Sequence, residues 1–121
     1  MQQDKTVQEL DELQRRLRVF AEVRDWEQFH SPKNLAMALV VEAGELVERF
    51  QWLTEAQSAM LEADAFSAVR QEMADVFLYL LRLADRLGID LLSAAHEKIV
   101  LNEQRYPADR VRGSSKKYNE Y

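Results

Sequence analysis

The amino-acid sequence predicts an all-α protein that folds as a four-helix bundle. Only three glycines and two prolines occur among its 121 residues, so the chain has few places to turn and its elements must be long. Apolar residues recur every three or four positions along most of the chain, which is the spacing of one face of a helix. Short connections between four such segments are typical of a bundle. The length suits one domain with a core of its own.

The first two helices are placed by the residues at their ends. Thr6 opens a capping-box pattern, and we expect a helix from there over about residues 7–24. Ser31 followed by Pro32 is a typical helix start, because serine caps free amide groups and proline fits the first turn. The second helix is expected to continue to about Trp52.

The third helix is also bounded by recognisable residues. Thr54 can cap one short extra turn before it. Asp64 is expected to cap the helix itself, over about residues 65–87. Gly88 ends this helix, since glycine adopts the left-handed conformation found after many helix ends.

A fourth helix and a basic tail complete the chain. Asp90 is expected to cap this helix, which runs to about Arg105 before Pro107 stops it. The residues that follow are basic on an otherwise acidic protein. We therefore divide the chain into a helical bundle domain over residues 1–107 and a tail over residues 108–121, and we expect the tail to pack on a neighbouring subunit or near a phosphate.

The second and third helices are apolar on nearly every face, most clearly in the run from Val76 to Leu81. Helices without a polar face are normally buried on all sides. One chain of this length has too little other surface to cover both. The sequence therefore predicts a homo-oligomer, either a homodimer or a tetramer made of two dimers.

Composition excludes several classes of protein. The formal net charge of −5 argues against a surface that binds nucleic acid polymers. No cysteine is present, so disulfides and thiolate metal sites are impossible, and a cytoplasmic location is expected. The N-terminus lacks the charged and apolar regions of a signal peptide. Every apolar run is far too short for a membrane span, so no membrane partner is expected.

Two pairs of acidic residues carry most of the functional information, Glu42-x-x-Glu45 and Glu72-x-x-Asp75. Their i, i+3 spacing places both carboxylates of a pair on one helix face. Glu42 lies within an apolar ridge, and no Lys or Arg lies within one helical turn of it. A buried carboxylate is costly unless it is paired or binds a metal, so four oxygen ligands here suggest a hard cation such as Mg²⁺. A solvated helix face explains a single pair, and spacing alone leaves both interpretations open.

Further segments accompany the four acids in a fixed order. Residues 25–35 read DWEQFHSPKNL, the first pair lies in EAGELVE with FQW close behind, and the second lies in EMADV. Near the C-terminus the chain carries Lys98, Asn102 and the segment RYP. Together they resemble the all-α nucleoside triphosphate pyrophosphohydrolases of the MazG-like superfamily, and most of all its dCTP pyrophosphatase branch. The resemblance covers nearly the whole chain.

This resemblance implies a hydrolase that clears unwanted nucleotides from the cellular pool. It would cleave a (deoxy)nucleoside triphosphate, dCTP or a related pyrimidine nucleotide, to monophosphate and pyrophosphate. Mg²⁺, with Mn²⁺ as a substitute, would be held by the four acids Glu42, Glu45, Glu72 and Asp75. Such ions neutralise charge that develops at the attacked phosphorus. Glu45 is the expected catalytic base, with Glu48 as its rival.

The same resemblance implies a set of substrate-binding residues, namely Trp26, His30, Trp52, Tyr79, Lys98 and Asn102. Aromatic rings offer stacking faces to a nucleobase, although two tryptophans in a small bundle can equally be core residues. Tyr79 lies one helical turn beyond Asp75, beside the expected metal. Leu17 departs from the pattern, because a polar or histidine side chain is expected there in dCTP-preferring relatives. We therefore expect looser selection of the base.

Three other interpretations fit less well. A non-catalytic helical dimer that senses nucleotides or binds proteins would be expected to have lost some of the acids, and all four are present. A di-iron carboxylate bundle needs two E-x-x-H motifs, and none occurs. A pyrophosphohydrolase of phosphoribosyl-ATP belongs to the same superfamily. Only the resemblance of the WEQFH and RYP segments to the dCTP pyrophosphatase branch argues against it.

Overall fold

The computed structural model describes residues 2–115, and over that range it contains helices and no strand. The helices are α1 (Gln2–Val23), a 3₁₀ turn η1 (Glu27–Phe29), α2 (Pro32–Glu48), α3 (Glu55–Ala59), α4 (Ala63–Leu87), α5 (Leu91–Arg105) and α6 (Ala108–Val111). The predicted all-α fold class is confirmed. The chain divides into two compact units, Met1–Gly88 and Ile89–Tyr121, which are described separately. The division into a bundle domain and a tail at residue 107 stays a prediction.

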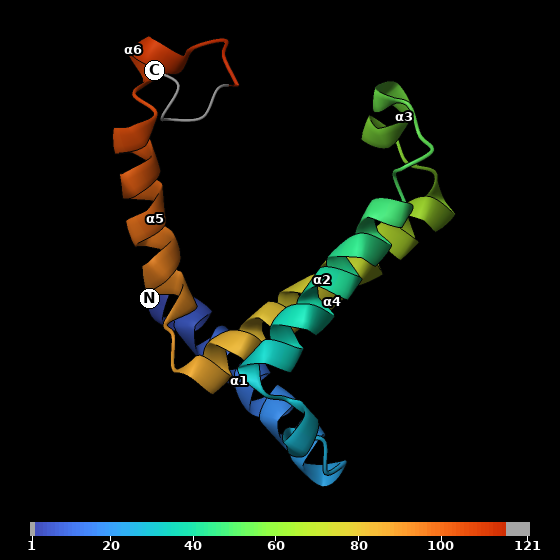
Figure 1. Cartoon of the computed structure of the whole chain (residues 1–121), viewed down its shortest axis with the longest axis vertical. Helices are drawn as coiled ribbons and strands as arrows, with labels where there is room; N and C mark the ends of the chain where they lie inside the picture. The colour runs from blue at the N-terminus through green and yellow to red at the C-terminus, as the bar shows by residue number, and fades with distance from the viewer. Residues whose placement is uncertain (1, 116–121) are drawn as a thin grey trace. The chain divides into compact units, whose positions relative to one another are not determined.

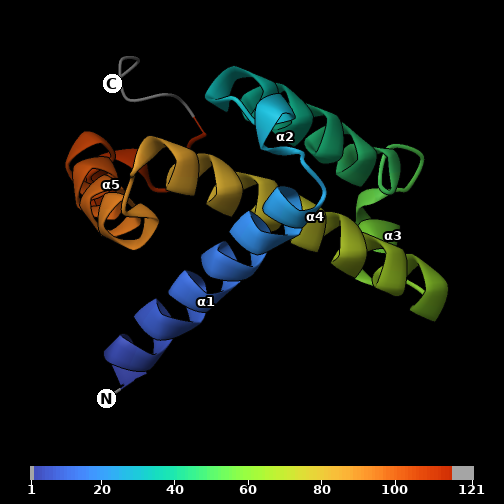
Figure 2. The same ribbon diagram turned by 90° about the horizontal axis from the view of Figure 1, so that it is seen from below.

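In the first unit α4 is the central helix. α2 lies antiparallel beside it, with α3 in the connection between them, and α1 crosses it (Figures 1 and 2). Leu35 of α2 and Leu81 of α4 are each 1% exposed, and Ala21, Val69 and Ala84 complete a small core. The antiparallel pairing brings the acidic residues of α2 close to those of α4.

Most of the predicted helix ends are confirmed. The Ser31 hydroxyl accepts the backbone N–H three residues further on, at 3.2 Å, at the start of α2. Thr54 forms a complete capping box before α3. Gly88 ends α4 with a φ of 67°, which is the left-handed conformation that glycine adopts without strain. The Asp90 carboxylate accepts a backbone N–H at 3.1 Å and caps α5.

Two predicted starts are wrong. α1 begins at Gln2 and passes through Thr6, because none of the residues before Thr6 is a helix breaker. α4 begins at Ala63, one residue before the expected cap. Asp64 therefore lies in the first turn, where its carboxylate still interacts favourably with the positive end of the helix.

The end of α2 also differs from the prediction. The helix stops at Glu48, and the residues up to Trp52 form turns rather than more helix. The hydrogen bonds tighten there, since the N–H groups of Arg49 and Phe50 bond the carbonyls of Leu46 and Val47, three residues back, as is common in the last turn of a helix. No glycine or proline marks the place.

The second unit consists of α5 and α6. α5 ends at Arg105, with Pro107 shortly after it, as predicted. Part of the basic tail is helical, since α6 follows Pro107 directly. Residues 116–121 of the tail lie outside the described residues. The expected packing of the tail on a subunit or near a phosphate stays a prediction.

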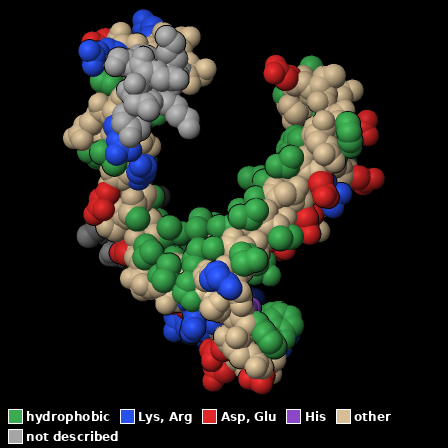
Figure 3. Space-filling view, in the orientation of Figure 1, with side chains coloured by type: hydrophobic (Ala, Val, Ile, Leu, Met, Phe, Trp, Pro, Cys, Tyr) green, Lys and Arg blue, Asp and Glu red, His purple; other side chains and the backbone are tan. Residues whose placement is uncertain are grey.

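Large apolar side chains are exposed along α2 and α4 (Figure 3). Six of them are between 57% and 71% exposed: Met37, Val40, Val41, Val47, Phe66 and Met73. Apolar surface gains about 25 cal/mol per Å² when it is removed from water, so a contiguous exposed set of this kind is unusual on a free monomer. None of the helices in the described part of the chain has the length and apolarity of a membrane span.

Candidate functional site

Three of the four predicted acids meet where α2 and α4 run side by side. Glu42 and Glu45 project from α2 and Glu72 projects from α4. One carboxylate oxygen of each lies within 4.8 Å of the others. Glu42 and Glu72 are half-buried, and Glu45 is exposed. We call these three residues the acidic cluster.

The acidic cluster has unpaired oxygens that fit a hard cation. Oε2 of Glu42 and Oε2 of Glu72 are buried and have no hydrogen-bond partner among the described residues. Burial raises the pKa of Glu42, and the neighbouring Glu45 raises it further through hydrogen bonding and charge. The charges of Asp75 and Glu72 act in the same direction. A divalent cation with oxygen ligands would satisfy both the orphaned oxygens and the excess negative charge.

Asp75 lies next to the acidic cluster without being part of it. Its side chain is exposed on α4, and its charge contributes to the raised pKa of Glu42. It also lines the pocket described below. The sequence pattern therefore brings three acids together and places the fourth at the border between the cluster and the pocket.

Arg49 is a cation that the sequence interpretation did not connect with the cluster. Its Nη2 lies 3.3 Å from Oε1 of Glu72, so the ion pair joins the end of α2 to α4. The pairing explains how Glu72 is accommodated, but it leaves the other Glu72 oxygen free. The sequence does indicate that Arg49 lies near the cluster. Arg49 comes seven residues after Glu42 and four after Glu45, so it shares their helix face.

A pocket of about 560 Å³ adjoins the acidic residues. Its wall is formed by α1, the η1 segment and α4, through Leu13, Arg16, Leu17, Phe20, Trp26, His30, Asp75, Leu78, Tyr79 and Arg82. Burial raises the pKa of Tyr79, as do the charges of Glu42, Asp75 and Glu45. The Tyr79 phenol therefore keeps its proton at neutral pH and can donate a hydrogen bond. The pocket is aromatic and apolar over most of its wall, with Asp75 at one border.

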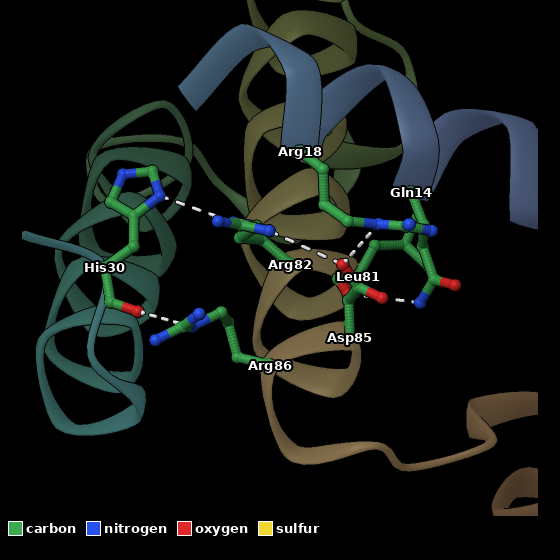
Figure 4. A network of polar contacts seen from close by, with 7 residues as sticks. All are labelled: Gln14, Arg18, His30, Leu81, Arg82, Asp85 and Arg86. Carbon is green, nitrogen blue, oxygen red and sulfur yellow. Dashed lines mark hydrogen bonds and ion pairs between the residues drawn. The ribbon is translucent and has the colours of Figure 1, made fainter. Parts of the chain in front are cut away.

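A network of polar contacts surrounds Arg82, which also lines the pocket (Figure 4). Arg82 is only 4% exposed, and its Nη1 lies 3.4 Å from Oδ2 of Asp85. Arg18 shares this carboxylate at 3.0 Å. The remaining Nη2 of Arg82 has no partner among the described residues, and burial lowers the pKa of the guanidinium. Sequence reasoning missed this network; its one signal was an arginine within an apolar stretch of α4.

His30 is held by two arginines of the same network. Arg82 Nε donates to Nδ1 of the imidazole at 3.4 Å, and Arg86 Nε donates to the His30 carbonyl at 3.1 Å (Figure 4). Burial lowers the pKa of His30, and the charges of Arg82 and Arg86 lower it further. A neutral imidazole that accepts at Nδ1 carries its proton on Nε2. His30 therefore offers a hydrogen-bond donor at physiological pH.

The two tryptophans occupy different surroundings, and neither is a core residue of the chain. Trp26 is 44% exposed and lines the pocket, with Phe20 at a ring-centroid distance of 5.6 Å and His30 at 6.4 Å. Trp52 is 87% exposed in the turns after α2 and does not line the pocket. Lys98 and Asn102 are exposed one helical turn apart on α5, in the second unit. The substrate-binding roles of all six predicted residues, Trp26, His30, Trp52, Tyr79, Lys98 and Asn102, stay predictions.

Comparisons with known proteins identify the family of the chain. The profile of the MazG-like family matches residues 37–121. The dCTP pyrophosphatase 1 of Homo sapiens is 44% identical over 113 residues, which is 92% of this chain and 66% of the human protein. The Mus musculus protein of the same name is 44% identical over an equal share of each chain. This chain thus spans about two thirds of the length of these curated relatives.

A solved structure shares the fold. The crystal structure of a pyrophosphatase from Archaeoglobus fulgidus superposes with a TM-score of 0.77 and is 37% identical, over 82% of this chain and 93% of that one. The chain therefore belongs to the MazG-like family.

Proposed function

We propose that the protein is a Mg²⁺-dependent nucleoside triphosphate pyrophosphohydrolase, which cleaves dCTP or a related pyrimidine nucleotide to the monophosphate and pyrophosphate. The observation that carries the proposal is the acidic cluster with its orphaned oxygens, beside a pocket large enough for a nucleoside. Membership of the MazG-like family and the names of the relatives support the same reaction class.

The metal would be held by Glu42, Glu45 and Glu72, with Asp75 as a further ligand from the same helix as Glu72. When bound, Mg²⁺ or Mn²⁺ would supply positive charge that offsets the negative charge developing at the attacked phosphorus. Four carboxylates alone would repel a triphosphate, so the substrate is expected to enter together with its cation.

Glu45 is the proposed catalytic base. It is the exposed member of the acidic cluster, so water can reach its carboxylate. Glu45 would accept a proton from the attacking water while the P–O bond to the departing pyrophosphate breaks. Glu48 is also exposed, but it is not a member of the cluster, which favours Glu45.

The pocket residues are proposed to hold the nucleoside. Trp26 offers a stacking face to the base, and the protonated Tyr79 phenol donates a hydrogen bond beside the acids. His30 donates from Nε2 to an oxygen or ring nitrogen of the substrate. Trp52, Lys98 and Asn102 are three further proposed substrate-binding residues. Leu17 in the pocket wall gives the base no polar partner, which supports loose selection among pyrimidines.

A homodimer, or a tetramer of two dimers, is the proposed assembly. The exposed apolar side chains along α2 and α4 support it, because a second copy of the chain would remove them from water. Light scattering at micromolar concentration tests this, and a monomer would contradict it.

A panel of triphosphates tests the proposed substrate. The full-length protein is incubated with canonical and modified nucleoside triphosphates and Mg²⁺, and pyrophosphate release is measured. We expect pyrophosphate release from dCTP and from other pyrimidine triphosphates. The preference for dCTP over the others should be less than several hundredfold. A protein that binds these nucleotides and releases no product would instead support the non-catalytic sensor.

A further inference from the structure

We propose that Arg49 is a phosphate-binding residue that is held on Glu72 until a divalent cation takes that carboxylate. This inference rests on the proposed function and adds a residue to it. Its basis is the ion pair between Nη2 of Arg49 and Oε1 of Glu72, which places a mobile cation on a carboxylate of the acidic cluster.

The geometry makes Arg49 easy to release. The Arg49 side chain is 49% exposed, whereas that of Glu72 is 13% exposed, so the fixed member of the pair is the carboxylate. Their separation of 3.3 Å is long for a charge-assisted hydrogen bond. Arg49 is the C-cap of α2, at the point where the helix gives way to turns.

Charge accounts for the ion pair between Arg49 and Glu72. Glu42, Glu45 and Glu72 bring three carboxylates within 4.8 Å of one another, and Arg49 offsets part of their repulsion. A divalent cation offsets more of it and binds the same carboxylate. Arg49 pairs with Oε1 of Glu72, and Oε2 of the same carboxylate has no partner, so a cation bound at Oε2 competes with the guanidinium through repulsion between like charges.

The released guanidinium has an evident partner in the proposed reaction. Arginine remains charged at any physiological pH, and its planar group binds phosphate oxygens in pairs. Arg49 shares a helix face with Glu42 and Glu45, so it stays at the rim of the acidic cluster when it leaves Glu72. The triphosphate must approach that cluster to meet the metal.

The proposal predicts effects of opposite sign on two ligands. In Arg49→Met the cluster loses its competing cation, so Mn²⁺ alone should bind about two- to fivefold more tightly, the range expected for one surface ion pair. A nucleotide with a non-hydrolysable imido bridge between its α and β phosphates should bind about tenfold to a hundredfold more weakly in saturating Mg²⁺, as expected for a lost charged hydrogen bond. Arg49→Lys keeps the charge and should lie between the wild type and Arg49→Met for both ligands.

The experiment uses electron paramagnetic resonance for Mn²⁺ and calorimetry for the imido analogue of dCTP, on the full-length protein. Arg15→Met is the matched control, because Arg15 pairs with Glu12 on an exposed face of α1. It should leave both affinities unchanged. Two outcomes would overturn the inference: both ligands binding more weakly to Arg49→Met, which indicates a structural residue, or neither affinity changing. If the wild-type protein itself binds no Mn²⁺ and hydrolyses no triphosphate, the proposed function fails instead.

Discussion

Glu42→Gln should make the metal-free protein more stable while it removes most of the activity. Glutamine keeps the shape of the side chain and deletes a charge that burial and three neighbouring acids disfavour. At 4.8 Å, one pair of carboxylates repels by about 1–2 kcal/mol for an effective dielectric constant of 40–80. Glu42 faces Glu45 and Glu72 at this range, and the half-buried amide of glutamine still needs hydrogen-bond partners, which offsets part of the relief. We expect a net gain of about 1–3 kcal/mol in the free energy of unfolding.

The pH dependence of this gain follows from the raised pKa of Glu42. A carboxyl whose pKa is raised in the folded protein stabilises it fully below its ordinary value of 4.5, and this contribution is lost as pH rises through the folded-state pKa. The wild type and Glu42→Gln should therefore unfold alike near pH 4 and differ at pH 7.5.

Thermal unfolding in chelator and in Mg²⁺ measures the effect. A gain of about 1–3 kcal/mol corresponds to roughly 3–12 °C in Tm for a chain of this size. Mg²⁺ at a hundredfold excess over its Kd should raise the stability of the wild type by about 2.7 kcal/mol and that of the mutant far less. A mutant that melts several degrees lower in chelator and still hydrolyses triphosphates would refute the reasoning, because Glu42 would then be a scaffold residue.

Three further predictions concern the pocket and its surroundings. Asp85→Asn leaves the buried Arg82 without a counterion and should lower the free energy of unfolding by about 3 kcal/mol. Arg82→Met removes the buried charge as well and should lower it by less, and chemical denaturation measures both variants. The pKa of His30, followed by NMR of the imidazole, should lie below the ordinary 6.5 and rise in Arg82→Met, and an unchanged value would show that Arg82 does not act on it. Trp52→Ala should raise KM more than it lowers kcat and leave Tm unchanged, since the side chain is 87% exposed; a large loss of stability would instead indicate a packing role.

The parts of the fold that the sequence predicts are those determined by neighbours in the chain. Ser31, Thr54, Gly88 and Asp90 act on backbone groups within a few residues, so their spacing alone identifies the helix ends. The end of α2 depends on a change to hydrogen bonds three residues back at Arg49 and Phe50, which no glycine or proline marks, so the helix ends before the predicted Trp52. Local sequence patterns therefore predict the presence of the helices better than they predict the residues at which the helices begin and end.

The candidate site likewise contains features that local sequence patterns predict and features that depend on packing between helices. The i, i+3 acids are local features, and the meeting of Glu42, Glu45 and Glu72 follows once α2 and α4 pair. Arg49 and Glu72 are 23 positions apart, so their ion pair depends on the register between the two helices. The burial of Arg82 and the place of His30 depend on packing between α1, η1 and α4, which no periodicity encodes.

Identification of the products tests the central claim most directly. The full-length protein is incubated with dCTP and Mg²⁺, and the products are separated by chromatography and assigned by phosphorus NMR. We expect dCMP and pyrophosphate in equal amounts, no free phosphate, and loss of turnover in chelator and in Glu45→Gln. Formation of dCDP and phosphate, or turnover that persists in chelator, would contradict the proposed reaction.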